Sequence, residues 1–202
     1  VFHAINTGLR CAALDAVMPF VTDLGLGHVQ AAALVVAACT AGALRGEFRG
    51  QQPFAAMIRA VAIRRRWIVP AMAALIITGI AVQFPKRVLR HRPSWFYATQ
   101  KRAGLTPEFE VRTIRGRRPL RLNGFPSGHT ATSTAIALVL SARVPRRRGY
   151  GTAIGAAWIL TAAIGLSRVY MADHWPLDVV GGVLFGVLGG TLVLCVFRER
   201  EQ

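Results

Sequence analysis

Five long runs of uncharged, mainly apolar residues constrain the fold of this chain more than any other feature. They cover residues 28–44, 67–85, 127–142, 149–167 and 179–197. A helix that crosses a bilayer needs roughly 17–25 such residues, so most of the runs have about the length of a membrane span. A soluble helical bundle is the alternative, but surface helices of soluble proteins normally carry a charged face. The runs therefore predict an integral membrane protein.

We predict an all-α fold, a polytopic transmembrane helix bundle of about five spans that forms a single domain over residues 1–202. The chain starts at Val1 without an initiator methionine, so we expect more sequence upstream, with a sixth span as one option. Residues 13–24 are apolar but are interrupted by Asp15, Pro19 and Asp23. This pattern suits either a helix lying in the membrane interface, within an N-terminal segment 1–27, or an ordinary loop helix.

The formal net charge of +16 is distributed unevenly along the chain. Arginines gather in residues 45–66, 143–148 and 198–200, which connect or follow the apolar runs. If the spans alternate in direction, these three segments lie on one side, which the positive-inside rule makes cytoplasmic. Because the charge sits largely in short loops between apolar helices, we do not expect a nucleic-acid partner.

The only long polar segment, residues 94–124, falls on the non-cytoplasmic side and is also basic, against a simple charge rule. Two interpretations are open. The basic residues form a solvated face, or they hold an anionic substrate or lipid headgroups above a site that the loop covers.

The tetrapeptide Pro126-Ser127-Gly128-His129 directly precedes the third apolar run. Ser127 is a good helix N-cap, and the first turn of a helix offers unpaired N–H groups and the positive end of a dipole. Gly128 lets the backbone approach a ligand closely, and His129 follows immediately. The motif indicates an anion cradle at the membrane surface, although alone it also fits a helix start with an incidental histidine.

A second polar cluster connects the fourth run to the fifth. Arg168, whose planar guanidinium suits bidentate contact with phosphate, ends the fourth run. His174 follows, and Pro176 is placed to be the first residue of the last helix. Asp178 then falls in the first helical turn, from where it reaches back to one ring nitrogen of His174 and leaves the other free as a nucleophile.

In these motifs the chain resembles the type 2 phosphatidic acid phosphatase superfamily, which includes membrane lipid phosphatases and the soluble vanadium haloperoxidases. The Pro-Ser-Gly-His sequence matches the second signature of that family, and Ser-Arg, five residues, His, three residues, Asp matches the third. The resemblance covers roughly residues 67–197. It implies that His174 is a nucleophile forming a phosphohistidine, that Asp178 orients it, and that His129 is the general acid. It assigns the phosphoryl oxygens to Ser127, Gly128 and Arg168.

The first signature of that family is lysine, six residues, then Arg-Pro. This chain has Lys86 and Arg92-Pro93, with one residue too few between them. We carry Arg92 over as a phosphate-binding residue. Lys86 is also a candidate, although one residue of helix turns a side chain by about 100°. Its flexible stem still reaches the site, or Arg87 or Arg90 replaces it, or Lys86 is an interfacial residue at the end of a span.

The cysteines Cys11, Cys39 and Cys195 are isolated, and no set of histidines, cysteines and carboxylates has metal-ligand spacing. We therefore predict no metal and no other cofactor. The sequence predicts a metal-independent lipid phosphate or pyrophosphate phosphatase at the outer face of a bacterial inner (cytoplasmic) membrane, in lipid metabolism of the cell envelope. Its partners would be the lipid phosphate substrate and membrane lipids.

By resemblance, the candidate substrates are undecaprenyl pyrophosphate, phosphatidylglycerophosphate, phosphatidic acid and lipid A phosphates, with a polyprenyl pyrophosphate or similar lipid favoured. Three other classes compete. A vanadium haloperoxidase would use nearly the same residues but is soluble. A transporter or lipid carrier would not need His174 and would keep its activity without it. A catalytically weak, lipid-binding protein of the same fold would not hydrolyse a purified lipid phosphate.

Overall fold

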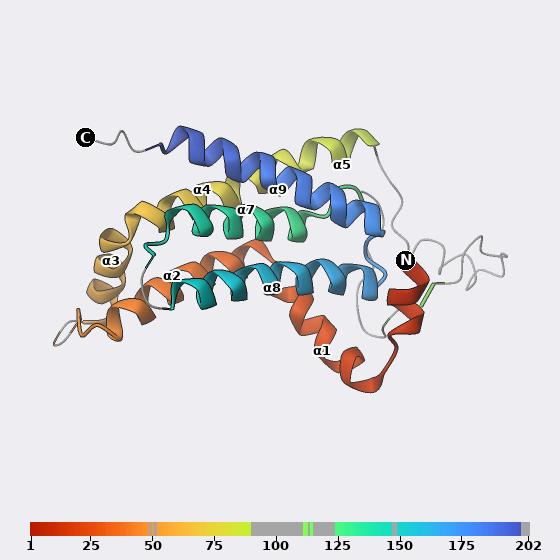
Figure 1. Ribbon diagram of the computed structural model, residues 1–202, viewed down its shortest axis with the longest axis horizontal. Coiled ribbons are helices and arrows are strands. Elements are labelled where there is room, and N and C mark those ends of the chain that lie inside the picture. The colour runs from red at the N-terminus through yellow and green to blue at the C-terminus, as the bar shows by residue number, and fades with distance from the viewer. Residues whose placement is uncertain are drawn as a thin grey trace.

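Helices account for nearly all of the structure, as the uncharged runs predict. The computed structural model describes residues 1–48, 50, 52–89, 111–112, 114, 124–146 and 149–198. The chain forms an elongated bundle in which most helices follow the long axis (Figure 1). In chain order these are η1 (a π-helical turn, Ala4–Gly8), α1 (Ala12–Asp23), α2 (Gly27–Ala43), α3 (Pro53–Ile63), α4 (Arg65–Ala81), α5 (Gln83–Leu89), α7 (Gly128–Arg143), α8 (Tyr150–Tyr170) and α9 (Pro176–Val196).

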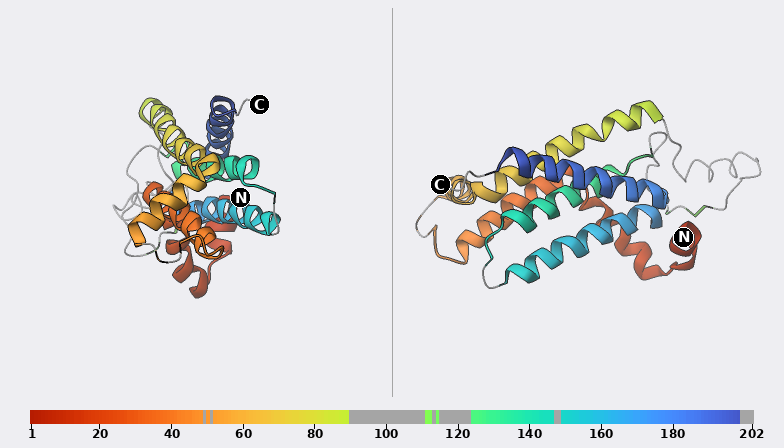
Figure 2. Two further views of the ribbon diagram at one scale, coloured as in Figure 1. Left: turned by 90° about the vertical axis from the view of Figure 1, so that its left-hand side faces the viewer. Right: turned by 45° about the horizontal axis from the view of Figure 1, so that its top comes forward.

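Helix α7 lies at the centre of the bundle. Helices α4, α8 and α9 all pack against it, and α4 in turn contacts both α2 and α9. The two further views show α9 and α5 diverging from one another at one end of the molecule, with α8 on the other side of α7 (Figure 2). The central position of α7 explains why it has a continuous series of buried and mostly small side chains, from Thr130 to Ala137.

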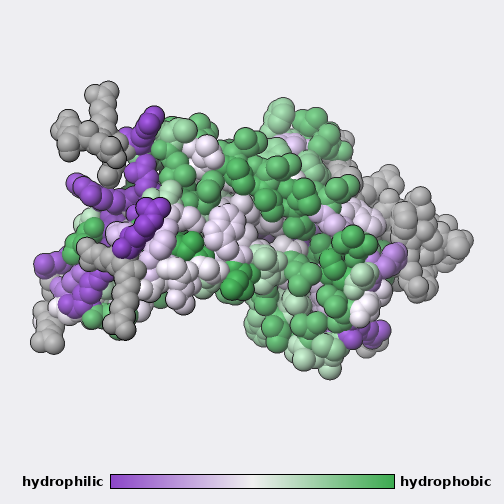
Figure 3. Space-filling model, in the orientation of Figure 1, coloured by the Kyte–Doolittle hydropathy of each residue, from purple (hydrophilic) through white to green (hydrophobic). Residues whose placement is uncertain are grey.

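All five uncharged runs are helical, with ends within a few residues of those expected. In the described part of the chain, α8, α9 and the stretch Arg65–Leu89 are long and apolar enough to cross a membrane. The pair α1 and α2 passes the same test together, with a bend of 79° between them. Helix α7 has 16 residues and is shorter than a typical span. Hydrophobic side chains cover the middle of the surface, and hydrophilic ones gather near α3 (Figure 3).

Glycines allow α7 and α9 to approach until their backbones touch. A Cβ atom on Gly182 would lie 2.6 Å from the Ser127 carbonyl oxygen, and one on Gly186 would lie 2.5 Å from that of Ala131. Such distances leave no room for a side chain. Without a hydrophobic drive between helices in lipid, this close approach supplies the van der Waals contact that holds them together.

Two features of the N-terminal half were not expected from the sequence. The arginine-rich sequence of segment 45–66 predicts a loop, but the segment contains α3, and the buried Arg64 that follows α3 forms an ion pair of 2.9 Å with Glu47. The helix expected at residues 13–24 is present as α1, and the 79° bend after it turns its end toward the site described below.

Candidate active site

The two sequence motifs meet at one end of the bundle. The start of α7, the end of α8 and the start of α9 lie together at the right of Figure 1, and the second half of the Arg65–Leu89 helix reaches the same end. Three separate parts of the sequence therefore supply the polar groups of one site.

Ser127 caps α7 as the sequence predicts. Its Oγ accepts a hydrogen bond from the backbone N–H of Thr130 at 3.5 Å and another from the Thr130 hydroxyl at 3.0 Å. The backbone N–H of Ser127 donates to the carbonyl oxygen of Asp178 at 2.9 Å. That bond joins the start of α7 to the first turn of α9, so the anion-binding end of one helix is held in register with the carboxylate of the other.

A tight turn connects α8 to α9. The N–H groups of Asp173 and His174 both donate to the carbonyl oxygen of Arg168, at 3.0 and 3.1 Å, and the N–H of Ala172 donates to that of Val169. This is the Schellman arrangement that ends many helices. Ala172 takes the left-handed position, with φ of 60°, which usually belongs to glycine and costs other residues about 1 kcal/mol or more. The turn fixes His174 directly against the backbone of Arg168.

His174 and Asp178 form a buried pair, each with only 1% of its surface exposed. Pro176 is the first residue of α9 and Trp175 is extended, as the sequence predicts. The Asp178 Oδ2 accepts a hydrogen bond from the Trp175 N–H at 2.9 Å and lies 3.5 Å from the His174 Nδ1. With Nδ1 facing a carboxylate, the proton of the neutral imidazole is favoured on Nδ1, and Nε2 keeps its lone pair.

Burial lowers the pKa of His174 to about 4. The interaction with Asp178 opposes this shift, while the cations Arg168 and Lys86 add to it. A lowered pKa keeps the imidazole neutral at physiological pH, which is the protonation state that a nitrogen nucleophile requires.

Arg168 is held by two residues that the sequence analysis did not single out. Its side chain is 5% exposed, and its Nη1 donates to the Thr22 hydroxyl at 2.7 Å and lies 2.9 Å from the Asp173 carboxylate. Thr22 is at the end of α1 and Asp173 is in the α8–α9 turn. The carboxylate and the hydroxyl fix the guanidinium in one orientation before any ligand arrives.

His129 lies in the first turn of α7, beside the bend between α1 and α2. A Cβ atom on Gly25 would lie 2.6 and 2.8 Å from atoms of the His129 side chain, so only glycine fits there. The His129 carbonyl also accepts a hydrogen bond from the Ser133 hydroxyl at 2.7 Å. The bend therefore forms a wall behind the proposed general acid.

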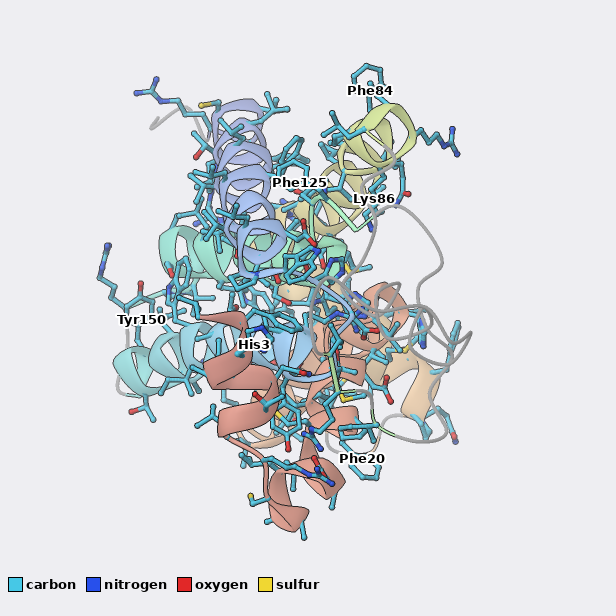
Figure 4. All side chains as sticks on the ribbon, turned by 90° about the vertical axis from the view of Figure 1, so that its right-hand side faces the viewer. His3, Phe20, Phe84, Lys86, Phe125 and Tyr150 are labelled. Carbon is cyan, nitrogen blue, oxygen red and sulfur yellow. The ribbon has the colours of Figure 1, made fainter. Side chains whose placement is uncertain are left out.

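Lys86 reaches this site from α5. A Cβ atom on Gly128 would lie 3.5 Å from the Lys86 Nζ, and Lys86 interacts electrostatically with Arg168 and Asp178. Only Val82, which has helical backbone angles, separates α4 from α5, so Lys86 lies near the end of the continuous stretch Arg65–Leu89. Viewed from the site end, Lys86 lies on the inner side of α5 and Phe84 on its outer side (Figure 4). Arg92 lies outside the described residues.

Short described pieces of the predicted loop 94–124 contact the N-terminal segment. The Arg112 guanidinium donates to both oxygens of Asp15 at 2.9 and 3.0 Å, and its backbone N–H donates to Asn6 Oδ1 at 2.9 Å. Asn6 in turn donates to the carbonyl oxygen of Tyr170, at the end of α8. These contacts tie the loop to the same end of the bundle as the site, and the rest of the loop lies outside the described residues.

The sequence offered little signal for Thr22, Gly25 and Asp173. The first two precede the motifs by about a hundred residues, and only their position near the end of an interrupted apolar helix sets them apart. Asp173 stands next to His174 in the sequence, and this position is a clearer signal that it lies at the site. No group of three or more histidine, cysteine, aspartate and glutamate side chains suited to hold a metal occurs in the described ranges.

As a whole, the site joins two cations, a helix N-terminus and a neutral, oriented imidazole. Lys86, Arg168 and the first turn of α7 attract an anion with several oxygens, such as a phosphoryl group. His174 supplies a nitrogen nucleophile, and His129 supplies a group able to give and take a proton. This combination is suited to phosphoryl transfer.

Comparison with known proteins leads to the same chemistry. A decaprenylphosphoryl-5-phosphoribose phosphatase of Mycobacterium tuberculosis is 29% identical over 150 residues, which cover 73% of this chain and 72% of that one. A lipid A 4'-phosphatase of Porphyromonas gingivalis is 31% identical over 133 residues, 63% of this chain and 54% of that one. The crystal structure of Aquifex aeolicus LpxE superposes with a TM-score of 0.67 at 24% identity, over 96% of this chain and 92% of that one.

The similarity in structure shows the fold. The model of the PAP2 superfamily matches residues 66–202, which contain both complete motifs together with Lys86. A phosphatase activity and a membrane-bound helical fold are supported by this match and by the phosphatase relatives. The chain belongs to the PAP2 superfamily.

Proposed function

We propose that the protein is a metal-independent lipid phosphatase that removes a terminal phosphate through a phosphohistidine intermediate. The observation that carries this proposal is the buried His174–Asp178 pair beside Arg168 and Lys86, which unites a neutral nucleophile with two phosphate-binding cations. Substrate candidates are undecaprenyl pyrophosphate, phosphatidylglycerophosphate, phosphatidic acid, lipid A phosphates and, from the mycobacterial relative, a phosphorylated polyprenyl sugar.

In the first step the phosphoryl group binds between Arg168, Lys86 and the N–H groups at the start of α7, with Ser127 and Gly128 at the cradle and Arg92 as a further cation. His174 Nε2 attacks phosphorus, and the bond from phosphorus to the lipid oxygen breaks. Protonated His129 gives its proton to that oxygen, so the lipid leaves as an alcohol or as a shorter phosphate. Charge on the equatorial oxygens is balanced by the same cations throughout.

In the second step a water molecule attacks the phosphohistidine. His129, now neutral, accepts a proton from the water, and the bond between phosphorus and Nε2 breaks. Inorganic phosphate leaves, and both histidines return to their starting protonation states. Asp178 stays ionised and holds the Nδ1 proton of His174 during both steps, as the carboxylate of a hydrolase triad does.

The active site would face the periplasm or the exterior. Eight of the arginines in the described residues lie at the opposite end of the bundle, around α3 and the ends of α7 and α9: Arg45, Arg59, Arg64, Arg65, Arg66, Arg143, Arg146 and Arg198. The positive-inside rule makes that end cytoplasmic. This orientation in the inner membrane is tested by offering a lipid phosphate only to the outer leaflet of oriented vesicles.

The deciding experiment is phosphate release by the purified protein from a panel of these lipids, with and without EDTA. His174→Ala should abolish turnover while the protein still folds in detergent, and His28→Ala, at an exposed histidine on α2, is the matched control. Vanadate should inhibit, since it mimics the five-coordinate transition state. Turnover that survives His174→Ala would overturn the nucleophile assignment, and loss of activity on chelation that magnesium restores would contradict metal independence.

If the folded protein hydrolyses none of the lipids, the alternative is favoured. That alternative is a catalytically weak lipid-binding or lipid-transport protein of the same fold. That outcome is distinguished from an unfolded sample by retained binding of vanadate. In that case His174→Ala would weaken vanadate binding, because the same residues would still hold the anion.

A further inference from the structure

A hollow of about 320 Å³ opens at the end of the bundle opposite the candidate active site. It lies where the start of α4 meets the ends of α7 and α9, three helices that all pack against one another. Hydrophilic side chains gather at this end of the molecule (Figure 3). Three arginines and three apolar residues form the described lining of the hollow: Arg65, Arg66, Arg143, Val69, Pro70 and Phe197.

The helical repeat of α4 builds one wall of the hollow. Arg65 and Arg66 stand in the first turn of this helix, and Val69 and Pro70 each follow one of them after four residues. Residues four apart lie on the same face of a helix, so each arginine has an apolar neighbour one turn farther along α4. Both arginines are exposed, and Val69 is 44% exposed. This face therefore changes from charged to apolar within a single helical turn.

The arginine directly before this pair has a different environment. Arg64 is buried, and its Nη2 lies 2.9 Å from a carboxylate oxygen of Glu47, so its charge is balanced inside the protein. Arg65 and Arg66 line the hollow instead, and no acidic residue is among the described residues that line it with them. Guanidinium groups gathered around one hollow repel one another, and an anion held between them lowers that repulsion.

Arg143 brings a third positive charge from the last turn of α7. Its Nη2 donates to the carbonyl oxygen of Phe197 and lies 3.4 Å from that of Leu194, both at the end of α9. These carbonyls hold the guanidinium in place but carry no formal charge, so they do not neutralise it. An arginine also has donors on Nε and Nη1, and these two bonds do not use them. Arg143 is thus fixed in position and still attracts an anion.

The hollow lies at the depth where the apolar helices leave the membrane. The stretch Arg65–Leu89 and α9 are both long and apolar enough to span a bilayer. Arg65 is the first residue of the one, and Phe197 follows the last residue of the other. Span ends lie near the lipid headgroups, and Val69 is about 6 Å farther along α4, toward the hydrocarbon. A ligand that fits this place has an anionic group beside an apolar part, as a phospholipid has.

We propose that this hollow binds the phosphate group of an anionic phospholipid from the leaflet at the α3 end of the bundle. Guanidinium groups bind phosphate oxygens in pairs, and basic pockets between membrane helices hold anionic headgroups. By the positive-inside rule this leaflet is the cytoplasmic one, opposite to the leaflet that the proposed active site faces. None of the described lining residues carries a nucleophilic group, so the lipid is held and not hydrolysed.

The first test needs only the unaltered protein. The protein in detergent is titrated with phosphatidylglycerol or with phosphatidylcholine that has the same acyl chains, and native mass spectrometry measures the bound lipid. Both lipids are phosphodiesters, so removal of a terminal phosphate does not consume them. We expect phosphatidylglycerol to bind at least about tenfold more tightly, because clustered arginines favour an anionic over a zwitterionic headgroup. Equal affinities would overturn the proposal.

Substitutions then assign the binding to the hollow. The double variant Arg65→Gln/Arg66→Gln should raise the Kd for phosphatidylglycerol by about tenfold. The matched control is Arg59→Gln/Arg146→Gln, which removes the same charge from exposed positions at the same end of the bundle but outside the hollow. It should leave the Kd nearly unchanged. Equal effects of the two double variants would mean that the lipid follows the overall surface charge, and would overturn the site. Circular dichroism and gel filtration check that both variants fold.

A last arm distinguishes a membrane lipid from an anion in solution. Inorganic phosphate and glycerophosphoglycerol, the headgroup without its chains, are added as competitors of bound phosphatidylglycerol. We expect both to compete far more weakly than a second phosphatidylglycerol of different mass, because they have no apolar part to place against Val69. Displacement by inorganic phosphate at the concentration of the lipid would identify a site for free phosphate and would overturn the lipid assignment.

This inference and the proposed function stand or fall separately. Phosphate release from a lipid substrate depends on His174 if the proposed function is correct, and binding of phosphatidylglycerol in the hollow does not require it. His174→Ala should therefore retain the difference in Kd between the two double variants. Loss of that difference in His174→Ala would place the bound lipid in the candidate active site and would overturn the second site.

Discussion

The two sides of α7 are packed in opposite ways. Toward α9, glycines at positions 182 and 186 bring the backbones into contact. Toward α2 and α8, leucine and isoleucine side chains keep the helices apart around a groove of about 210 Å³. The same helix thus has one face that fixes neighbouring groups and one that borders an open groove.

The difference shows how one helix of a small membrane protein can combine rigid backbone contacts with open volume. Chemistry requires that reacting groups be held within fractions of an ångström, and the α7–α9 contact provides this through the bond from Ser127 N–H to the Asp178 carbonyl. On the opposite face, larger apolar residues surround open volume instead of making such contacts.

Loss of the carboxylate charge on the tight side should have the largest effect. Asp178→Asn keeps the size of the side chain but no longer stabilises the Nδ1 proton of His174. We expect kcat to fall by about 10³–10⁴-fold, as for the equivalent change in a hydrolase triad, with little change in KM. Steady-state kinetics on the preferred lipid measures this, and a fall of less than tenfold would show that Asp178 serves the fold alone.

Filling the contact between α7 and α9 should come next. Gly182→Ala places a methyl group 2.6 Å from the Ser127 carbonyl oxygen, which is backbone and cannot move freely. We expect about a tenfold loss of kcat/KM and a lower Tm, since overpacking typically costs about 1–3 kcal/mol. Gly155→Ala on α8, where a Cβ meets nothing within 4 Å, is the control and should retain both values. Equal behaviour of the two variants would refute the claim that the α7–α9 face is tight.

A smaller effect is expected on the side formed by the bend after α1. Thr22→Val removes the hydroxyl that accepts from Arg168 Nη1 at 2.7 Å and preserves the shape of the side chain. Asp173 still pairs with Arg168, so we expect kcat/KM to fall by about three- to tenfold. Thr7→Val, which removes a hydroxyl bonded only to the local His3 carbonyl, is the matched control. No loss with Thr22→Val would mean that Asp173 alone orients the guanidinium.

The smallest expected effect concerns the burial of His174. Its pKa of about 4 lies below the ordinary 6.5, so the free enzyme keeps a neutral nucleophile until the pH falls toward 4. Activity that depends on the neutral ring is therefore still present at pH 6.5 and is lost as the pH falls through about 4. In the pH profile of kcat/KM, the acid limb should lie near pH 4 for two substrates whose phosphate groups have different pKa values. A limb near 6.5 that is the same for both would contradict the burial of His174.

Much of the fold was predictable, because bilayer length and the absence of charge are local properties of a sequence. The five runs, the cap at Ser127 and the helix start at Pro176 depend on neighbouring residues alone, and all three appear in the structure. The α3 helix was missed because its short apolar stretch lies between arginines, which made the segment look like a loop.

The surroundings of the site were predictable only in part, for a different reason. Thr22 and Gly25 reach the motifs through a bend of 79°, and no local pattern gives the direction of such a bend. The spacing between Lys86 and Arg92 left several places open for Lys86, and its proximity to Gly128 follows from the packing of the stretch Arg65–Leu89 against α7. The groove arises from three helices together, and no single stretch of sequence contains it.

The turn after α8 has a consequence for how this region can change in length. Two successive N–H groups, those of Asp173 and His174, share the carbonyl oxygen of Arg168. If one residue were inserted or deleted, the Arg168 carbonyl would accept hydrogen bonds from different N–H groups, and His174 would rotate away from Arg168. Backbone geometry therefore fixes the number of residues between Arg168 and His174 at five. Their identity can vary far more easily than their number. Anyone grafting this site onto another scaffold should move residues 167–178 as one uninterrupted piece.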